Sequence, residues 1–211
     1  MDARHPQAVG ARAIAFVDGQ NLFYAAKDAF GYEYPNYDVL KLARRVCSDK
    51  GWVLTETRFY TGVPAAEDSP FWNHFWQAKL AQIGRMNVVV YSRPLKYRNA
   101  VVKLPDGRAG TQLVGQEKGI DIRIALEMVR AAYEGRCDVL LVFSQDQDLT
   151  EAVAEVGWVA RQARRELRIA CAFPDSPTSR NSRGIDKTDW IRIDRATYDA
   201  CIDTRDYRPK K

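Results

Sequence analysis

Hydrophobic and polar residues alternate along this chain in blocks that are typical of β-strands followed by α-helices. The apolar run at residues 13–17 meets Asp18, and the segment 21–28 after it has the pattern of a helix. Residues 39–49 carry an apolar stripe at helical spacing, preceded by the capping residue Asp38. The same patterns predict further strands at 53–60, 87–91, 138–143, 167–173 and 190–193, and further helices at about 69–83, 120–133, 149–165 and 196–201. This succession of strands and helices predicts an α/β fold with a mostly parallel sheet.

Residues 93–116 interrupt the alternation. Within them the sequence VVKLPDGRAGTQLV places a Pro-Asp-Gly turn between two β-like arms, which predicts a β-hairpin inserted into the fold. The rest of the chain predicts one domain at 12–203, with a flexible leader at 1–11 and a polar tail at 204–211.

The composition narrows the class of protein. With 211 residues, of which 46% are hydrophobic, the chain is long enough to bury a core. It lacks an apolar run of the roughly 18 to 20 residues that span a membrane, and its start MDARHPQAVGAR lacks the apolar stretch of a signal peptide, so we expect a cytoplasmic protein. Four widely separated cysteines argue against a zinc site or a disulfide framework. Two histidines supply little chemistry of the Ser-His-Asp kind, and a formal charge of +5 favours a polyanionic partner.

Acidic residues gather where the predicted strands end. Asp18 ends the first strand, and Asp121 lies near the start of a helix. Asp146 and Asp148 follow the apolar run at 139–142. Ligands of open parallel sheets bind beyond the carboxyl ends of the strands, so we expect these side chains to converge. Converging carboxylates repel one another unless a cation neutralises them, and oxygen ligands without Cys or His select Mg²⁺ or Mn²⁺, which can activate water for phosphodiester hydrolysis.

Each of these acidic residues also has a structural explanation. Asp18 in DGQN suits a turn. Asp146 or Asp148 could cap the following helix, and so could Ser144. The charge of Asp121 is favourable beside a helix N-terminus. Because only one cap is needed and acidic residues occur at three separate places, a shared acidic site is favoured.

Two further polar residues lie near this acidic set in the sequence. Asn21 follows Asp18 by three residues and could orient a ligand water or a phosphate. Glu127 follows Asp121 by six residues, about one and two-thirds helical turns, so the two do not share one narrow face of the helix. Asp121 is therefore the better candidate for the crevice.

Three short segments resemble the motifs of one family. They are VDGQN at 17–21, KGIDIRIALEM at 118–128 and SQDQDL at 144–149. In order and spacing they match the Asp-Gly-x-Asn, Lys-Gly-x-Asp and Ser-Gly-Asp-x-Asp-Phe segments of the NYN family, in the LabA-like branch of PIN-like metal-dependent ribonucleases. The resemblance spans about residues 12–195. Three motifs in order are far more specific than any one of them.

The resemblance implies a three-layer α/β/α PIN-like sheet whose acidic pocket holds Mg²⁺ or Mn²⁺ and cuts RNA. Carried over motif by motif, the catalytic residues and metal ligands would be Asp18, Asp121, Asp146 and Asp148, and the supporting residues would be Asn21, Ser144, Glu127 and Lys118. Glu127 stands where family members often have Asp. The third motif departs from the family at two positions, with Gln145 in place of Gly and Leu149 in place of Phe. Gln145 fits only if this loop needs no positive φ.

Two basic segments are candidates for contact with single-stranded RNA. The segment YSRPLKYRN at 91–99 mixes tyrosines with cations, which can stack bases and neutralise phosphates, although a solvated hairpin arm has the same composition. Arginines between 161 and 168 recur at helical spacing and predict either a positive stripe near the third motif or a plain solvated face. The candidate contacts in the two segments are Arg93, Lys96, Tyr97, Arg98, Arg161, Arg164 and Arg165.

The helix predicted at about 69–83 begins with an aromatic segment. Phe71, Trp72, Phe75 and Trp76 lie on one broad face of the predicted helix. This spacing predicts a core contact or the contact surface of a homodimer, in preference to a platform for stacked bases.

Two other functions are consistent with parts of the pattern. Asp146, Asp148 and Thr150 after an apolar run resemble the Asp-x-Asp-x-Thr motif of haloacid-dehalogenase-like phosphatases. That motif ordinarily ends the first strand, whereas only about 60 residues follow it here, and Asp18 would have no role. A catalytically inactive PIN-like module that binds RNA or a protein is the other alternative, and the altered third motif supports it. A metal-dependent endoribonuclease accounts for more of the acidic residues than either.

Overall fold

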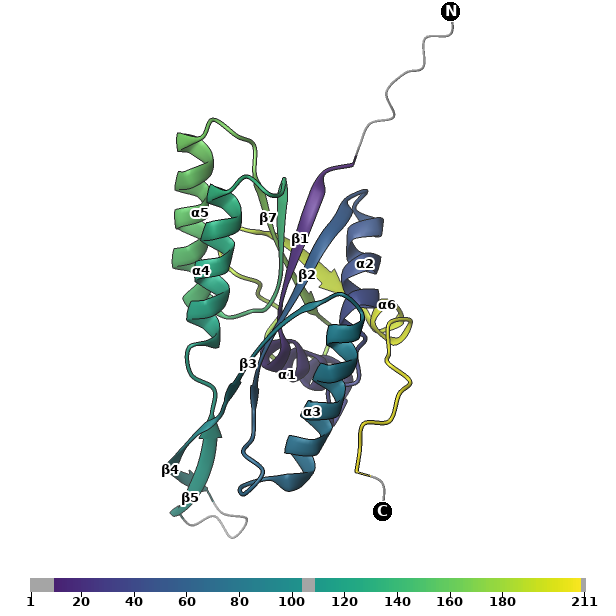
Figure 1. Ribbon diagram of the computed structural model, residues 1–211, viewed down its shortest axis with the longest axis vertical. Coiled ribbons are helices and arrows are strands. Elements are labelled where there is room, and N and C mark those ends of the chain that lie inside the picture. The colour runs from purple at the N-terminus through teal and green to yellow at the C-terminus, as the bar shows by residue number, and fades with distance from the viewer. Residues whose placement is uncertain (1–9, 104–108, 210–211) are drawn as a thin grey trace, which may run out of the picture.

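The computed structural model describes residues 10–103 and 109–209 (Figure 1). Its centre is a sheet made of β1 (Arg12–Asp18), β2 (Val53–Val63), β3 (Val89–Pro94), β6 (Val139–Phe143), β7 (Arg168–Pro174) and β8 (Asp189–Ile193). The strands lie in the order β3-β2-β1-β6-β7-β8, and all neighbouring pairs are parallel. The predicted α/β fold with a mostly parallel sheet is confirmed.

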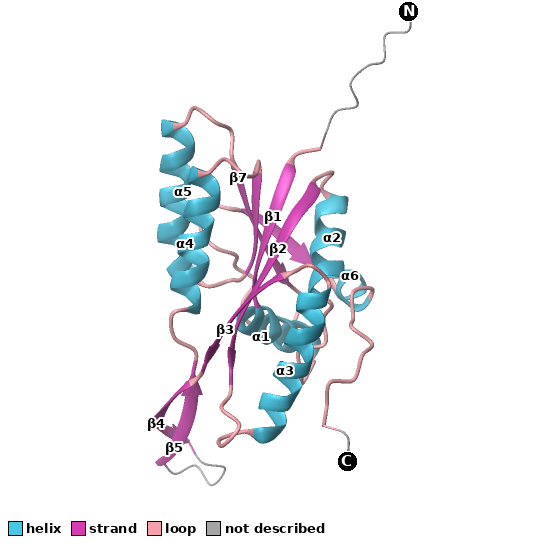
Figure 2. Ribbon diagram, in the orientation of Figure 1, coloured by secondary structure: helices cyan, strands magenta, loops and turns pink. Residues whose placement is uncertain are grey.

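Helices cover both faces of this sheet (Figure 2). They are α1 (Gly19–Phe30), α2 (Val39–Asp49), α3 (Pro70–Arg85), α4 (Ile120–Tyr133), α5 (Thr150–Gln162) and α6 (Arg195–Asp199). On β1, Ala13, Ala15 and Val17 pack in the cluster that contains α1, α2, α3 and α6, whereas Ile14 and Phe16 pack in the cluster that contains α4 and α5. The result is a three-layer α/β/α arrangement. Within the described ranges, no helix combines the length and apolarity that a membrane crossing requires.

The inserted hairpin is present and stands apart from the central sheet. It consists of β4 (Lys96–Lys103) and β5 (Ala109–Gln116), which pair antiparallel as a separate two-stranded sheet. Figure 1 shows the hairpin projecting beyond the end of β3, near the start of α4. The prediction at 93–116 is confirmed, except that its first two residues belong to β3. The Pro-Asp-Gly turn itself lies outside the described residues.

The helix predicted at 149–165 differs at both ends. It begins with a 3₁₀ turn, η1 (Gln147–Leu149), and the α-helix that follows ends at Gln162. Beyond that end, Arg164 has a φ of 49°, which a right-handed helix cannot continue through. The arginines at the end of the predicted stripe therefore lie outside the helix.

The aromatic segment of α3 supplies core side chains, as predicted. Phe75 and Trp76 are buried in the cluster on the α1 side of the sheet, and Trp72 packs against the same cluster. Phe71 is 44% exposed. The helix thus places its broad aromatic face on the sheet and leaves one edge open.

The described part of the predicted polar tail at 204–211 is exposed except at Tyr207, which attaches the segment to the domain. Tyr207 is 9% exposed, and its ring meets that of Phe75 edge-on with centroids 5.9 Å apart. Its hydroxyl donates to Asp203 at 2.6 Å, and the same carboxylate lies 3.5 Å from the buried ammonium of Lys79. Polar residues surround a single aromatic anchor in this segment, and composition alone hides the anchor. The last two residues of the predicted tail lie outside the described ranges.

The predicted leader is described only at its end. Ala11 already belongs to the folded domain, because its carbonyl accepts a hydrogen bond from the N–H of Val53 at 2.9 Å. Residues 1–9 lie outside the described ranges.

Candidate active site

The carboxyl ends of β1 and β6 lie side by side in the middle of the sheet. Val17 is in register with Phe143, so the loop after β6 starts beside Asp18. From β1 the strand order continues to β2 and β3 on one side, whereas β6 leads to β7 and β8 on the other. Open α/β sheets bind their ligands at the carboxyl ends of strands where the order reverses in this way.

A pocket of about 510 Å³ lies at this crevice. Three parts of the chain meet there: the start of α1, the segment that leads into α4, and the loop after β6. The lining residues are Asp18, Gln20, Asn21, Tyr24, Glu117, Lys118, Gly119, Ile120, Asp121, Ile122 and Asp146. Three of the four predicted catalytic residues, Asp18, Asp121 and Asp146, therefore share one pocket.

Asp18 has both a structural role and a place in the pocket. It is only 6% exposed and caps α1, because its side chain accepts a hydrogen bond from the N–H of Asn21 at 3.0 Å. This cap is the reason that α1 starts at Gly19, before the predicted start at residue 21. Burial raises the pKa of Asp18 to about 6; the charge of Asp146 adds to the rise, and the N–H of Asn21 opposes it.

Two supporting residues hold the loop after β6 against the start of α1. The Asn21 side-chain oxygen accepts a hydrogen bond from the N–H of Gln145 at 2.8 Å. The hydroxyl of Ser144 donates to Asp18 at 3.3 Å and accepts from the N–H of Asp146 at 3.2 Å. Asn21 and Ser144 are therefore positioning residues for the acidic pocket.

The loop accommodates both departures from the family motif. Among the described residues other than glycine, positive φ occurs only at Asn87, Arg164 and Lys187, so the backbone at Gln145 does not need a glycine. Leu149 is 1% exposed and packs in the cluster that contains α4 and α5, so the leucine fills a buried apolar position.

Asp148 lies outside the pocket. Its side chain is exposed, and its N–H donates to the Asp146 carboxylate at 3.0 Å, which caps η1. The sequence spacing of Asp146 and Asp148 does not predict that only Asp146 lines the pocket, because neighbouring side chains on a turn point in different directions. Of the four predicted acidic residues, Asp148 is therefore the one that does not line the pocket.

Glu117 is an acidic residue of the pocket that the sequence analysis missed. It accepts a hydrogen bond from the N–H of Gly62, near the end of β2. The pKa of Glu117 is raised to about 8, mainly by burial and in part by the charges of Asp18 and Asp121, against the opposing hydrogen bond from Gly62. The available signal was its position immediately before the Lys118-Gly119 of the second motif.

Glu127 lies in a different network, on the buried side of α4. It accepts hydrogen bonds from Arg58, from Arg123 and, at 2.6 Å, from the hydroxyl of Tyr60. Burial by itself would raise the pKa of Glu127, but the hydrogen bonds from Tyr60 and Arg58 and the neighbouring positive charges outweigh it, so the pKa is lowered. Glu127 is the buried partner in ion pairs with Arg58 and Arg123, and it does not line the acidic pocket.

The pocket suits a hard cation by its chemistry and charge. Within residues 10–103 and 109–209, no three Asp, Glu, His or Cys side chains stand close enough together to hold a metal ion without moving. The lining carboxylates are nevertheless oxygen donors of the kind that Mg²⁺ and Mn²⁺ prefer. A divalent cation among them would also offset the repulsion that contributes to the raised pKa values of Asp18 and Glu117. The residues present therefore match such an ion in donor chemistry and charge, although their side chains are not gathered around one point.

Comparison with models of known protein families identifies the family of this chain. The family model of the NYN domain matches residues 12–179, which is most of the sequence and includes all three motifs. The chain belongs to the NYN domain family. This membership places the domain among the PIN-like nucleases.

Other comparisons add no function. The comparison with curated proteins found no match to the sequence of this chain. Among solved structures, the comparison found the crystal structure of MurG from Acinetobacter baumannii, which is 8% identical in sequence to this chain and superimposes with a TM-score of 0.34. The alignment covers 87% of the NYN domain chain and 45% of MurG, so this chain spans less than half the length of that protein.

The arginine row at 161–165 lies far from the acidic pocket of the NYN domain, which corrects its predicted place near the third motif. Helix α5 starts beside the third loop and runs for 13 residues, about 20 Å, to the opposite edge of the sheet. There Arg161 lines a hollow with residues from the start of β7. Arg165 donates to the carbonyls of Ala132 at 3.2 Å and Cys137 at 2.8 Å, so it serves the packing of the fold.

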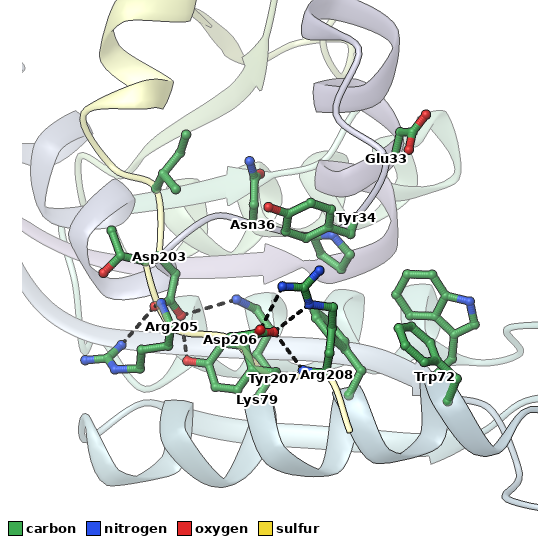
Figure 3. A pocket seen from close by; sticks show the side chains of 15 residues that line it. Glu33, Tyr34, Asn36, Trp72, Lys79, Asp203, Arg205, Asp206, Tyr207 and Arg208 are labelled. Atoms are coloured by element: carbon green, nitrogen blue, oxygen red, sulfur yellow. Dashed lines mark hydrogen bonds and ion pairs between the residues drawn. The ribbon is translucent and has the colours of Figure 1, made fainter. Parts of the chain in front are cut away.

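A second cavity of the NYN domain, of about 410 Å³, lies between α3 and the C-terminal segment (Figure 3). Its aromatic wall includes Tyr34 and Trp72, and the buried Lys79 lies at its base. Several of its other charged groups form ion pairs, as Arg208 does with Asp206 at 2.7 Å. This cavity is separate from the acidic pocket.

Proposed function

We propose that this NYN domain is a metal-dependent endoribonuclease that hydrolyses phosphodiester bonds of single-stranded RNA. The observation that carries the proposal is the meeting of Asp18, Glu117, Asp121 and Asp146 in one pocket at the carboxyl ends of β1 and β6. Family membership supports a nuclease as the class of enzyme.

Mg²⁺ or Mn²⁺ is the proposed cofactor. Asp18, Asp121 and Asp146 would hold the ion with Glu117 beside them. When bound, such an ion supplies a Lewis acid for the phosphate and lowers the pKa of a bound water. Asp148 enters the proposal through its motif alone, since its side chain is exposed outside the pocket.

The other motif residues support this centre. Asn21 and Ser144 fix the position of the loop that carries Asp146. Lys118 is exposed at the wall of the pocket, where its ammonium group can attract a phosphate. In this proposal the carboxylates of the pocket bind the cation, and Lys118 at the wall of the pocket binds the phosphate of the substrate.

The test is cleavage of a labelled single-stranded RNA by the purified protein with Mn²⁺ or Mg²⁺, with and without a chelator. We expect chelator-sensitive cleavage that Asp146→Asn lowers by about 100-fold or more. The matched control is Asp68→Asn, which makes the same change on an exposed loop and should cleave like the wild type. Circular dichroism and Tm verify that each variant is folded, and calorimetric titration with Mn²⁺ measures the ion separately from activity.

Two results would contradict the proposal. RNA that is bound but remains intact with every metal would indicate the inactive RNA-binding module. Release of phosphate from a small phosphomonoester that is lost in Asp146→Asn and retained in Asp18→Asn would indicate the phosphatase.

A further inference from the structure

Another hollow, different from those described above, adjoins the acidic pocket on the side of the hairpin. Seven residues line it: Arg93, Pro94, Leu95, Lys96, Lys118, Gly119 and Ile122. Three of them are exposed cations and none is acidic. We call this hollow the basic groove.

The basic groove and the acidic pocket are neighbours with a common wall. Lys118, Gly119 and Ile122 line both of them. If one phosphate of a polyanion occupies the acidic pocket, the next phosphates on the hairpin side therefore lie beside cationic side chains. That alternation of a cation-binding centre and a basic track suits a chain of phosphates.

The fold holds one side of the basic groove in a defined position. The guanidinium of Arg93 donates to the hydroxyl of Tyr91 at 2.6 Å and lies 5.5 Å from the centre of its ring. On the same ring, Arg123 lies 4.8 Å from the centre. At Gly119 the backbone has a φ of 74°, and a Cβ there would come within 2.6 Å of the Arg93 guanidinium. Only glycine allows this close approach of the cation to the backbone at the start of α4.

The hairpin extends the cationic surface beyond the basic groove. Arg98 lies two residues after Lys96 on β4 and so faces the same side of the hairpin. Tyr97 faces the opposite side, where its ring lies against Gly115 of the paired strand, so a Cβ there would be 3.0 Å from the ring. The cations of segment 91–99 are therefore displayed outward, and Tyr97 serves the packing of the hairpin.

We propose that the basic groove binds the phosphates of the RNA strand next to the bond that is cut, so that the hairpin is part of the substrate-binding surface. This inference rests on the function proposed for the acidic pocket. It assigns Arg93 and Lys96 as positioning residues for the substrate, and it leaves the arginine row at the far edge of the sheet outside the path of the RNA.

The test measures binding of a labelled single-stranded RNA of mixed sequence, about 16 nucleotides long, to full-length protein carrying Asp146→Asn so that the strand stays intact. In that protein, Arg93→Ala/Lys96→Ala removes one Arg and one Lys from the basic groove. The matched control is Arg161→Ala/Lys187→Ala, which removes the same two residue types from the hollow near the start of β7. All four side chains are exposed, and Tm verifies that the variants are folded.

We expect the groove variant to raise the Kd roughly tenfold at physiological salt and to reduce the slope of log K against log salt by about 1.4, the value for two lost phosphate contacts of a single strand. The control should bind like its parent. Equal weakening by both variants, or no weakening by the groove variant, would overturn the inference.

Cleavage by otherwise wild-type protein separates this inference from the proposed function. RNA that binds through the basic groove without being cut would contradict the nuclease and support the groove. RNA that is cut and bound equally well by the Arg93→Ala/Lys96→Ala variant would support the nuclease and contradict the groove.

Discussion

At the scale of single residues, the folded protein destabilises the ionised form of two carboxyl groups in the acidic pocket. Asp18 and Glu117 are both buried enough that their pKa values rise, to about 6 and about 8, and negative neighbours add to both shifts. In each case the unfolded chain loses the proton at lower pH than the folded chain does. Without a cation, ionisation of the pocket therefore opposes folding, and the metal ion proposed for this pocket would relieve that opposition.

Glu117→Gln should make stability in a chelator less dependent on pH. The pKa of Glu117 rises from an ordinary 4.5 to about 8, so between these values the unfolded state holds fewer protons and the free energy of unfolding falls as pH rises. The glutamine cannot ionise, and its side-chain oxygen can still accept from Gly62. We expect the Tm of the variant to exceed that of the wild type near pH 8 and to equal it near pH 4.5. The exposed Glu155→Gln is the control, and a Glu117→Gln profile parallel to the wild type would contradict the shift.

At the scale of elements, the loop between β6 and α5 is tied to a second loop far along the chain. The Gln145 amide donates to the carbonyls of Asn181 at 2.9 Å and Arg183 at 3.0 Å. The Gln147 amide donates to the carbonyl of Gly184 at 2.9 Å. Two glutamines thus fasten the segment after β7 across the loop that carries Asp146. The residue that departs from the family motif has a defined structural role in this chain.

Gln145→Ala should destabilise the domain by about 1–3 kcal/mol, because two backbone carbonyls lose their donor at a site that is only 8% exposed. Chemical denaturation of the variant and the wild type measures the difference. The control is Gln162→Ala at the exposed end of α5, which should change stability by less than about 0.5 kcal/mol. Equal stability of Gln145→Ala and the wild type would show that the two carbonyls find other partners.

At the scale of the whole molecule, the C-terminal segment is fastened to α3 by a buried charge. The Lys79 ammonium donates to the carbonyl of Tyr37 at 3.0 Å, lies 3.5 Å from Asp203, and sits 5.0 Å from the ring centre of Tyr207. Tyr37 in turn donates to the carbonyl of Gly19, directly after Asp18, at 2.7 Å. The chain end, α3 and the start of α1 are therefore joined through one buried group of side chains.

Asp203→Ala should cost about 3–5 kcal/mol of stability, since it leaves the Lys79 ammonium buried without its counter-ion. Replacing both partners, as Lys79→Met/Asp203→Ala, should cost less than the single change. Denaturant unfolding compares the two variants with Asp206→Ala, which breaks an exposed pair and should cost under about 1 kcal/mol. A double variant less stable than Asp203→Ala would contradict the explanation by unpaired charge.

Most of the fold could be predicted from the sequence because it depends on local periodicity. Apolar runs such as 139–142 are typical of strands buried on both faces, and the stripe at 39–49 behind Asp38 became α2 with the expected cap at 2.9 Å. The hairpin followed from its turn residues. The C-terminal anchor did not, since a lone Tyr207 among charges has no periodicity.

By itself, the sequence determined the α/β architecture, through its local periodicity, and the family, through three ordered motifs. It also placed Asp18, Asp121 and Asp146 where strands end or helices begin, and these three residues line one pocket. Only the tertiary structure decided that Glu117 enters the pocket while Asp148 stays outside it. The same holds for the basic groove at the hairpin and for the position of the arginine row at the far edge of the sheet. The physical reason is that spacing gives a residue its place along an element, whereas the direction of a side chain on a loop depends on contacts with segments distant in sequence.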